Sequence, residues 1–222
     1  MSKSKKVFSM PIFLTQLSVV LLMIIVGIVL YDALPEQIPA HWNTAGEVDS
    51  YMDKMHAVLL FPGITLLMVV LFPLLSSIDP RKKNYKSFLR PWHIVQMAIV
   101  AFFAYLYFVI LYLAFHPQAS IEMFVFVGIG VLFIIIGNYL GKMRQNYFVG
   151  IKTPWTLNNE KVWNKTQRVG GWAFLIAGLI ILINGFVQWQ LVASMVFAIV
   201  LAVLLPIVYS YYAYRRFKAQ DK

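Results

Sequence analysis

Cysteine is absent from this chain of 222 residues, and acidic residues are scarce. The absence of cysteine excludes disulfides, thiol nucleophiles, thiolate zinc sites and iron–sulfur clusters. Aspartate and glutamate total 9 against 19 lysines and arginines, so the formal net charge is +10. Charged residues make up 13% of the chain and apolar residues 60%, with a mean hydropathy of +0.73. These values differ strongly from those of soluble domains and indicate an integral membrane protein.

Six apolar segments approach or exceed the roughly 20 helical residues that are needed to cross a bilayer core. They are residues 12–31, 57–75, 93–115, 121–140, 171–187 and 191–214. The sequence therefore predicts an all-α, polytopic membrane protein with six transmembrane helices. We divide it into an N-terminal three-helix region, residues 1–120, and a C-terminal three-helix region, residues 121–222.

The basic residues gather in alternate connections between these spans. Clusters lie within residues 3–6, 81–90, 142–168 and 215–222, and Lys54 is the one Lys or Arg in the remaining connections. Because positive charge in short connections is retained in the cytoplasm, both termini are predicted to be cytoplasmic. The charges follow the topology of a chain surrounded by membrane lipids, which argues against direct nucleic-acid binding.

The largest segment on the opposite side is an acidic outer loop, residues 32–56. Pro35 and Pro39 favour extended backbone there, and residues 43–46 are typical of a turn. An acidic outer surface attracts cationic ligands, including cationic peptides. The histidines and aspartates of this loop fit no metal-binding spacing, so no metal site and no cofactor are predicted.

The interiors of the spans lack Asp, Glu, Lys and Arg, which weakens the case for a proton-coupled transporter. The polar residues inside them are expected to form hydrogen bonds between helices, and these residues are Gln16, Thr65, Gln96, Asn138 and Ser194. Gly130, Gly137 and Gly141 lie on one helical face, and we expect them to allow close approach of another helix of the same chain.

A polar interval, residues 141–171, separates the fourth and fifth spans, and we call it the signature segment. Its first part is rich in turn-forming residues, with Thr153 pushed toward extended backbone by Pro154 and Trp155 placed as an interfacial anchor. The second part predicts a short interfacial helix near residues 158–169, begun by Asn158 and ended by Gly170 and Gly171. One face would carry Lys161, Lys165 and Arg168, and the other Val162, Trp163, Thr166 and Val169.

Two sets of residues resemble known membrane families. The first set resembles the SdpI family: Gly137, Asn138, Asn146, Gly150, residues 152–157, Glu160, Val162, Trp163 and Arg168. The second resembles a small membrane domain of unknown function that often precedes the SdpI region: Leu34, Pro35, Ile38, Pro39, residues 41–43, Gly46, Asp49, Tyr51 and Lys54. Lys152 stands where the family usually has arginine, and Gln167 where many members have histidine.

The resemblance implies a non-enzymatic immunity protein of the bacterial plasma membrane. Such a protein protects the cell against an extracellular hydrophobic peptide toxin and, in the named member, also holds a cytoplasmic repressor at the membrane. The candidate toxin contacts are Pro39, His41, Trp42, Asn43, Asp49 and Tyr51. The candidate partner contacts are Asn146, Gly150, Lys152, Thr153, Pro154, Trp155, Glu160, Trp163 and Arg168.

Two other classes of function compete with this interpretation. Six helices also suit a small-molecule or lipid transporter. A membrane enzyme that acts on a lipid-linked substrate would use His41, Asp49 and Asp53 on one side, or Asn146 and Glu160 on the other. No spacing identifies an acid, a base or a nucleophile among them, so an enzyme is the less favoured hypothesis.

Overall fold

The computed structural model describes residues 7–43 and 46–220. Within them, six helices are long and apolar enough to cross a membrane, which confirms the predicted spans. They are α1 (Met10–Leu30), α2 (Lys54–Ile78), α4 (Leu89–Phe115), α5 (Ile121–Leu140), α7 (Glu160–Val187) and α8 (Leu191–Gln220). The shorter elements are a 3-10 turn (Tyr31–Ala33), β1 (Gln37–Trp42), β2 (Val48–Asp53), α3 (Lys82–Tyr85) and α6 (Pro154–Asn158).

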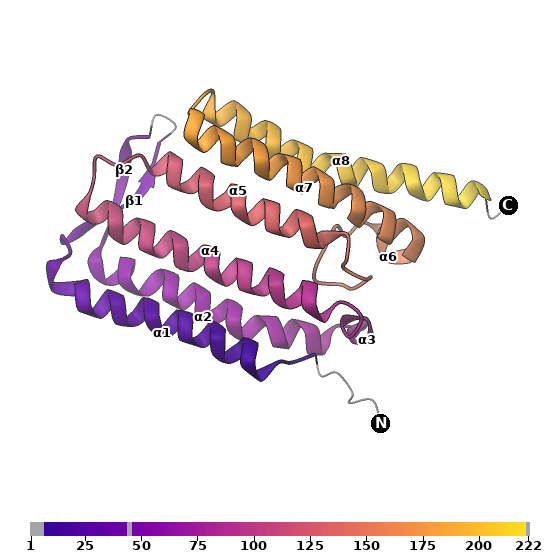
Figure 1. Cartoon of the computed structure of the whole chain (residues 1–222), viewed down its shortest axis with the longest axis horizontal. Helices are drawn as coiled ribbons and strands as arrows, with labels where there is room; N and C mark the ends of the chain where they lie inside the picture. Colours follow the sequence, from indigo (N-terminus) through magenta and orange to yellow (C-terminus); the bar gives the residue numbers. More distant parts are fainter. Residues whose placement is uncertain (1–6, 44–45, 221–222) are drawn as a thin grey trace.

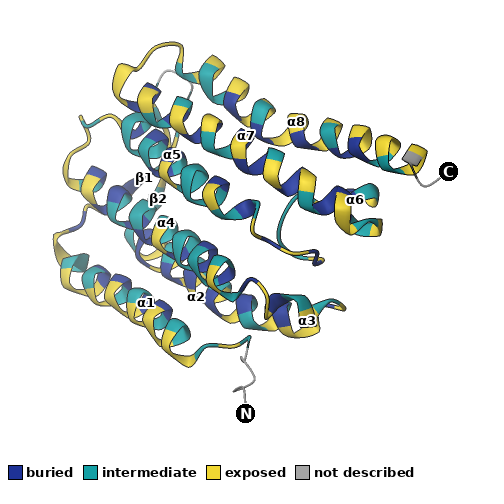
Figure 2. Cartoon of the chain, turned by 45° about the vertical axis from the view of Figure 1, so that its right-hand side comes forward, coloured by how far each residue is buried: buried dark blue, intermediate teal, exposed yellow. Residues whose placement is uncertain are grey.

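The long helices form two groups of three that lie side by side (Figure 1). Helices α1, α2 and α4 pack together around aromatic and aliphatic side chains such as Trp92 and Tyr107. Helices α5, α7 and α8 pack around smaller residues such as Ala177 and Ala202, and α4 contacts α5 where the groups meet. The helices expose their outer faces (Figure 2), and apolar side chains such as Val29 and Val208 are largely exposed there, as expected of helices surrounded by lipid.

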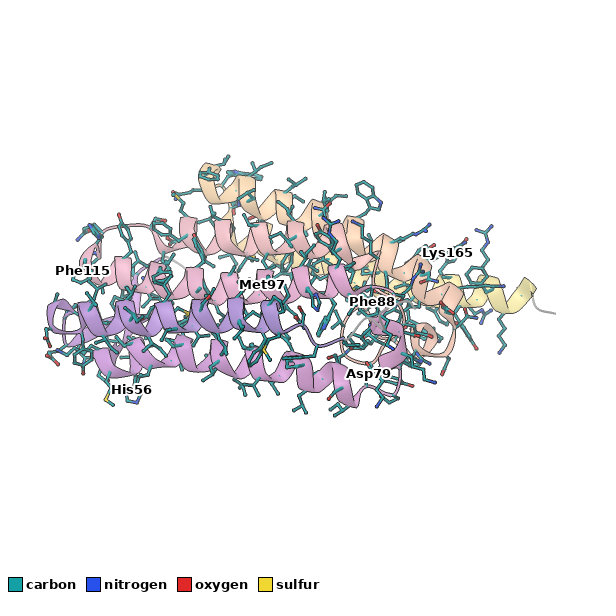
Figure 3. The ribbon with its side chains drawn as sticks, turned by 60° about the horizontal axis from the view of Figure 1, so that its bottom comes forward. His56, Asp79, Phe88, Met97, Phe115 and Lys165 are labelled. Atoms are coloured by element: carbon teal, nitrogen blue, oxygen red, sulfur yellow. The ribbon has the colours of Figure 1, made fainter. Side chains whose placement is uncertain are left out.

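The bundle has two polar ends, which we name from their elements. The hairpin end carries β1 and β2, and the signature end carries α3, α6 and the loop of residues 141–153 (Figure 1). His56 and Phe115 lie at the hairpin end, Asp79, Phe88 and Lys165 at the signature end, and Met97 between them (Figure 3). The start of α1 and the end of α8 both lie toward the signature end. Lys3, Lys5, Lys6 and Lys222, and positions 44 and 45 of the expected turn, lie outside the described residues.

The predicted separate interfacial helix at residues 158–169 is wrong. Residues 160–169 form the first turns of α7, which continues without a break to Val187. Its N-cap is Asn159, and Asn158 is the last residue of α6. Gly170 and Gly171 do not end the helix because their faces are packed, and a Cβ on Gly171 would come within 2.8 Å of the Gly137 carbonyl oxygen. The expected close approach of another helix to Gly130 and Gly137 is thus confirmed as packing of α5 on α7.

The side-chain pattern within these first turns is largely confirmed. Lys161, Lys165 and Arg168 are exposed, and Val162, Trp163 and Thr166 are buried, whereas Val169 is only partly buried. The expectation of hydrogen bonds between helices is wrong for Thr65 and Asn138 and confirmed for Ser194. The Thr65 hydroxyl and the Asn138 amide donate to carbonyls of their own helices, and Ser194, which accepts from Asn184, bonds between helices. A polar group in an apolar helix is satisfied most simply by the carbonyl one turn before it.

Residues 32–56 contain a two-stranded hairpin that the sequence did not predict beyond extended backbone and a turn. β1 and β2 pair antiparallel, with irregular register between Pro39 and Trp42. The backbone N–H of Asn43 donates to Glu47 O over 2.9 Å, and Gly46, at a φ of 81°, turns the chain. Ile38 is fully buried on the bundle, and Trp42 packs beside Val109 and Leu113. This packing fixes the hairpin on the ends of α2 and α4.

Candidate functional site

Asn146 organises the loop of residues 141–153. Its side chain is fully buried. The amide nitrogen donates to the carbonyls of Arg144 at 2.8 Å and Val149 at 2.9 Å. The amide oxygen accepts from the backbone N–H groups of Phe148 at 2.9 Å and Val149 at 2.7 Å. One side chain thus satisfies four backbone groups that the irregular loop leaves without partners, as buried polar groups require.

Two side chains on the buried face of α7 form hydrogen bonds with the backbone of the same loop. The indole Nε1 of Trp163, a fully buried residue, donates to Met143 O over 2.8 Å. The Gln167 amide donates to Ile151 O and accepts from Ile151 N, each at 3.0 Å, and so pairs with both backbone groups of one residue. Gly150, the residue before Ile151, has a φ of 113°. A Cβ added to it would lie 2.8 Å from Gln167 Oε1. Glycine is therefore required here for both conformation and space.

Helix α6 begins with a reciprocal capping box. Thr153, in extended backbone as predicted, accepts from the Thr156 N–H, and the Thr156 hydroxyl accepts from the Thr153 N–H at 2.8 Å. The Thr153 hydroxyl also lies 3.1 Å from the Ser210 hydroxyl of α8, and the Trp155 ring packs on Tyr211 with centroids 5.1 Å apart. These contacts tie α6 to the last helix.

Sequence reasoning missed Asp79, which links the N-terminal helices to the signature segment. Its carboxylate is almost fully buried and accepts from Arg81 N at 2.6 Å, Tyr147 N at 2.9 Å and the Tyr85 hydroxyl at 3.0 Å. Burial, followed by the charge of Asp79, raises the pKa of Tyr85 well above its ordinary value. A lone acid at the start of the basic segment 79–90 was the signal available in the sequence.

Arg81 strengthens this link between the two halves of the chain. Its guanidinium Nη2 donates to Leu157 O over 2.8 Å, and the group lies over the Tyr147 ring, 5.0 Å from the centroid. Gln145 donates to the Thr156 and Leu157 carbonyls at 2.6 and 3.0 Å. The signature end is therefore a continuous hydrogen-bonded network that spans α3, the loop and α6.

The candidate partner contacts divide by exposure. Asn146, Thr153 and Trp163 are buried, and Gly150 and Trp155 are partly buried. The exposed members are Lys152, Pro154, Glu160 and Arg168. Buried members support the surface by holding its backbone, so any direct contact with a partner falls to the exposed members.

The hairpin presents its polar side chains outward. His41 Nδ1 lies 2.6 Å from Asp49 Oδ1, and both side chains are exposed. The ring of Tyr51 is 56% exposed, while Trp42 and Asn43 are partly buried and Pro39 is buried. Of the candidate toxin contacts, His41, Asp49 and Tyr51 are therefore the most accessible.

Two further pairs fix the junction between β2 and α2. Asp53 caps α2 by accepting from His56 N at 3.0 Å, and its carboxylate also contacts the His56 ring. The backbone N–H of His56, followed by its side chain, lowers the pKa of Asp53. Glu36 binds Lys54 at 2.9 Å. Groups of three or more His, Asp or Glu side chains placed to hold a metal do not occur within residues 7–43 and 46–220.

Comparison with known proteins gives three findings. Residues 142–210 match the SdpI/YfhL protein family, and residues 19–66 match a domain of unknown function, DUF1648. The chain is 26% identical over 199 residues to the immunity protein SdpI of Bacillus subtilis (strain 168), which covers 89% of this chain and 93% of that protein. No solved structure matches the chain significantly.

Proposed function

We propose that this chain, whose residues 142–210 match the SdpI/YfhL protein family, is an immunity protein of a bacterial plasma membrane that protects its cell against an extracellular peptide toxin. The relative that aligns over most of its length is an immunity protein, and the chain is a multi-pass membrane protein. No catalytic step is part of this proposal.

Charge placement supports an outward-facing hairpin end. The signature end carries the basic segments 81–90 and 142–168, whereas Lys54 is the one Lys or Arg of residues 32–56. Positive charge in short connections stays in the cytoplasm. This orientation gives an arriving peptide access to the hairpin and gives soluble cytoplasmic proteins access to the signature end.

The observation that carries the proposal is the outward presentation of His41, Asp49 and Tyr51 on a hairpin anchored by buried Ile38. A peptide that contacts an exposed tyrosine buries apolar surface against the ring and can form a hydrogen bond with the hydroxyl group. The neighbouring carboxylates favour a cationic segment of that peptide, in a salt-dependent manner.

The test is survival of a sensitive strain challenged with the sporulation-delaying peptide toxin. Cells that express the chain should survive, and the double variant His41→Ala with Tyr51→Ala should lose protection at an unchanged level in the membrane. The matched control is Lys152→Ala with Pro154→Ala, two exposed residues at the opposite end. Equal survival with and without the unsubstituted chain would refute the immunity function.

A second part of the proposal concerns the signature end as a docking surface for a cytoplasmic repressor. Lys152, Pro154 and Glu160 are exposed on a backbone that the buried network holds in place. The variant Lys152→Glu with Glu160→Lys conserves net charge but reverses the surface pattern, so it should abolish co-purification of the repressor and leave protection intact. Undiminished capture by this variant would rule out this surface.

A further inference from the structure

A groove of about 280 Å³ opens on the outside of the bundle between α5 and α7. It lies in the half of these helices nearer the signature end, between residues 137–142 at the end of α5 and just beyond it and residues 168–175 of α7. The Gly137 and Gly171 backbones are so close that a Cβ on either glycine would lie under 3 Å from the other helix. The floor of the groove is therefore backbone, and the exposed Trp172 ring forms one wall.

A second, polar cleft of about 380 Å³ adjoins the groove and shares Gly141, Lys142 and Arg168 with it. This cleft adds Arg144 and Asn164, so three cationic side chains line it and no acidic one does. Arg144 Nη1 donates to Asn164 Oδ1 at 3.3 Å, and the Lys142 ammonium lies 4.5 Å from the Tyr139 ring centroid.

These contacts leave the positive charges uncompensated. Within residues 7–43 and 46–220, contacts of a basic side chain with a carboxylate join His41 to Asp49, Lys54 to Glu36 and His56 to Asp53, all at the hairpin end. The cleft thus concentrates charge of one sign and lies next to an apolar groove. An anion with an attached apolar chain is complementary to this arrangement.

We propose that the groove and the cleft together bind one anionic phospholipid. The headgroup phosphate lies among Lys142, Arg144 and Arg168, and an acyl chain follows the glycine floor beside Trp172. The position suits a lipid because α7 changes from polar to apolar between Arg168 and Trp172, which is the boundary that a phospholipid spans. This lipid site is separate from the proposed immunity function. In it, Arg168 binds a lipid headgroup instead of a protein partner.

The experiment measures tryptophan fluorescence of the full chain in bilayer discs that contain bromine-labelled phosphatidylglycerol or, separately, bromine-labelled phosphatidylcholine. The difference between the chain and its Trp172→Phe variant isolates the quenching of Trp172. Phosphatidylglycerol should quench Trp172 more strongly than phosphatidylcholine does, and this comparison needs no charge variant to fold.

Charge variants then locate the headgroup. Lys142→Gln with Arg168→Gln should weaken phosphatidylglycerol binding roughly 20- to 30-fold, since each cation near anionic lipid contributes roughly fivefold. Lys161→Gln with Lys165→Gln removes the same amount of charge from α7 outside the groove, and it should weaken binding by less than about fivefold. Equal quenching by the two lipids, or equal losses in the two double variants, would overturn the proposal. Neither readout involves a toxin, so failure here leaves the immunity function untouched.

Discussion

The two ends of the bundle use polar residues in opposite ways. At the signature end, the side chains of Asn146 and Asp79 are buried and satisfy backbone groups of the loop of residues 141–153. At the hairpin end, His41 and Asp49 pair on the surface and leave Tyr51 accessible. The difference teaches that the signature segment, which carries more of the family's characteristic residues, has mainly a structural role. The hairpin presents the more accessible side chains.

The largest expected effect comes from removing the loop's central amide. Asn146→Leu keeps a similar volume but leaves four backbone groups unsatisfied, so it should lower the free energy of unfolding by ~3–5 kcal/mol. Unfolding of the purified protein in mixed micelles with increasing sodium dodecyl sulfate measures the change. The control is Asn138→Leu, because Asn138 is exposed and donates within its own helix. Equal losses in both variants would contradict the scaffold role of Asn146.

A smaller loss is expected at the link between the two halves. Asp79→Asn should lower the free energy of unfolding by ~2 kcal/mol, because the neutral amide cannot accept from Arg81, Tyr147 and Tyr85 together. Asp32→Asn, an exposed acid near the hairpin end, should change it by less than about 0.5 kcal/mol. The same unfolding titration compares the two, and a loss at Asp32 that matched the loss at Asp79 would remove the distinction between the ends.

The exposed hairpin pair should contribute little to stability. His41→Ala with Asp49→Ala is expected to change the free energy of unfolding by about 1 kcal/mol or less, since exposed ion pairs are screened by water and salt. Circular dichroism during thermal unfolding follows the change. A loss comparable with that of Asn146→Leu would mean that the hairpin is also a structural support.

The two ends should also differ in their response to pH. The lowered pKa of Asp53 means that its stabilisation is present at neutral pH and is lost as pH falls below its ordinary value of 3.8. The raised pKa of Tyr85 has the opposite consequence, because the unfolded chain loses this proton near pH 10.0 while the folded chain retains it. Local stability at the signature end should therefore fall at alkaline pH. Tyrosinate absorbance of the chain and its Tyr85→Phe variant tests this, and ionisation of Tyr85 near pH 10.0 would contradict it.

Periodicity and charge predicted the six spans, the exposed stripe of Lys161, Lys165 and Arg168, and the close packing at Gly137. Those features depend on residues near one another in the chain. The continuous α7 was missed because two adjacent glycines favour a helix end unless another helix packs on them, and that contact is distant in sequence.

The candidate site was predicted less completely for the same reason. The extended Thr153 follows from Pro154 alone. In contrast, the buried role of Asn146 depends on how the loop closes, and the role of Asp79 depends on Tyr147, which lies 68 residues further along the chain. The register irregularities of β1 and β2 also obscure the alternation by which strands are recognised.

Amide hydrogen exchange of the purified chain, with and without the peptide toxin, tests the contrast between the two ends most directly. The amides of Tyr147, Phe148, Val149, Ile151 and Thr153 should exchange slowly in the free protein, because buried side chains accept hydrogen bonds from them, and the toxin should not alter their rates. The toxin should instead slow exchange across residues 37–53 of the hairpin. Slowing confined to residues 143–153, with the hairpin unchanged, would contradict the account.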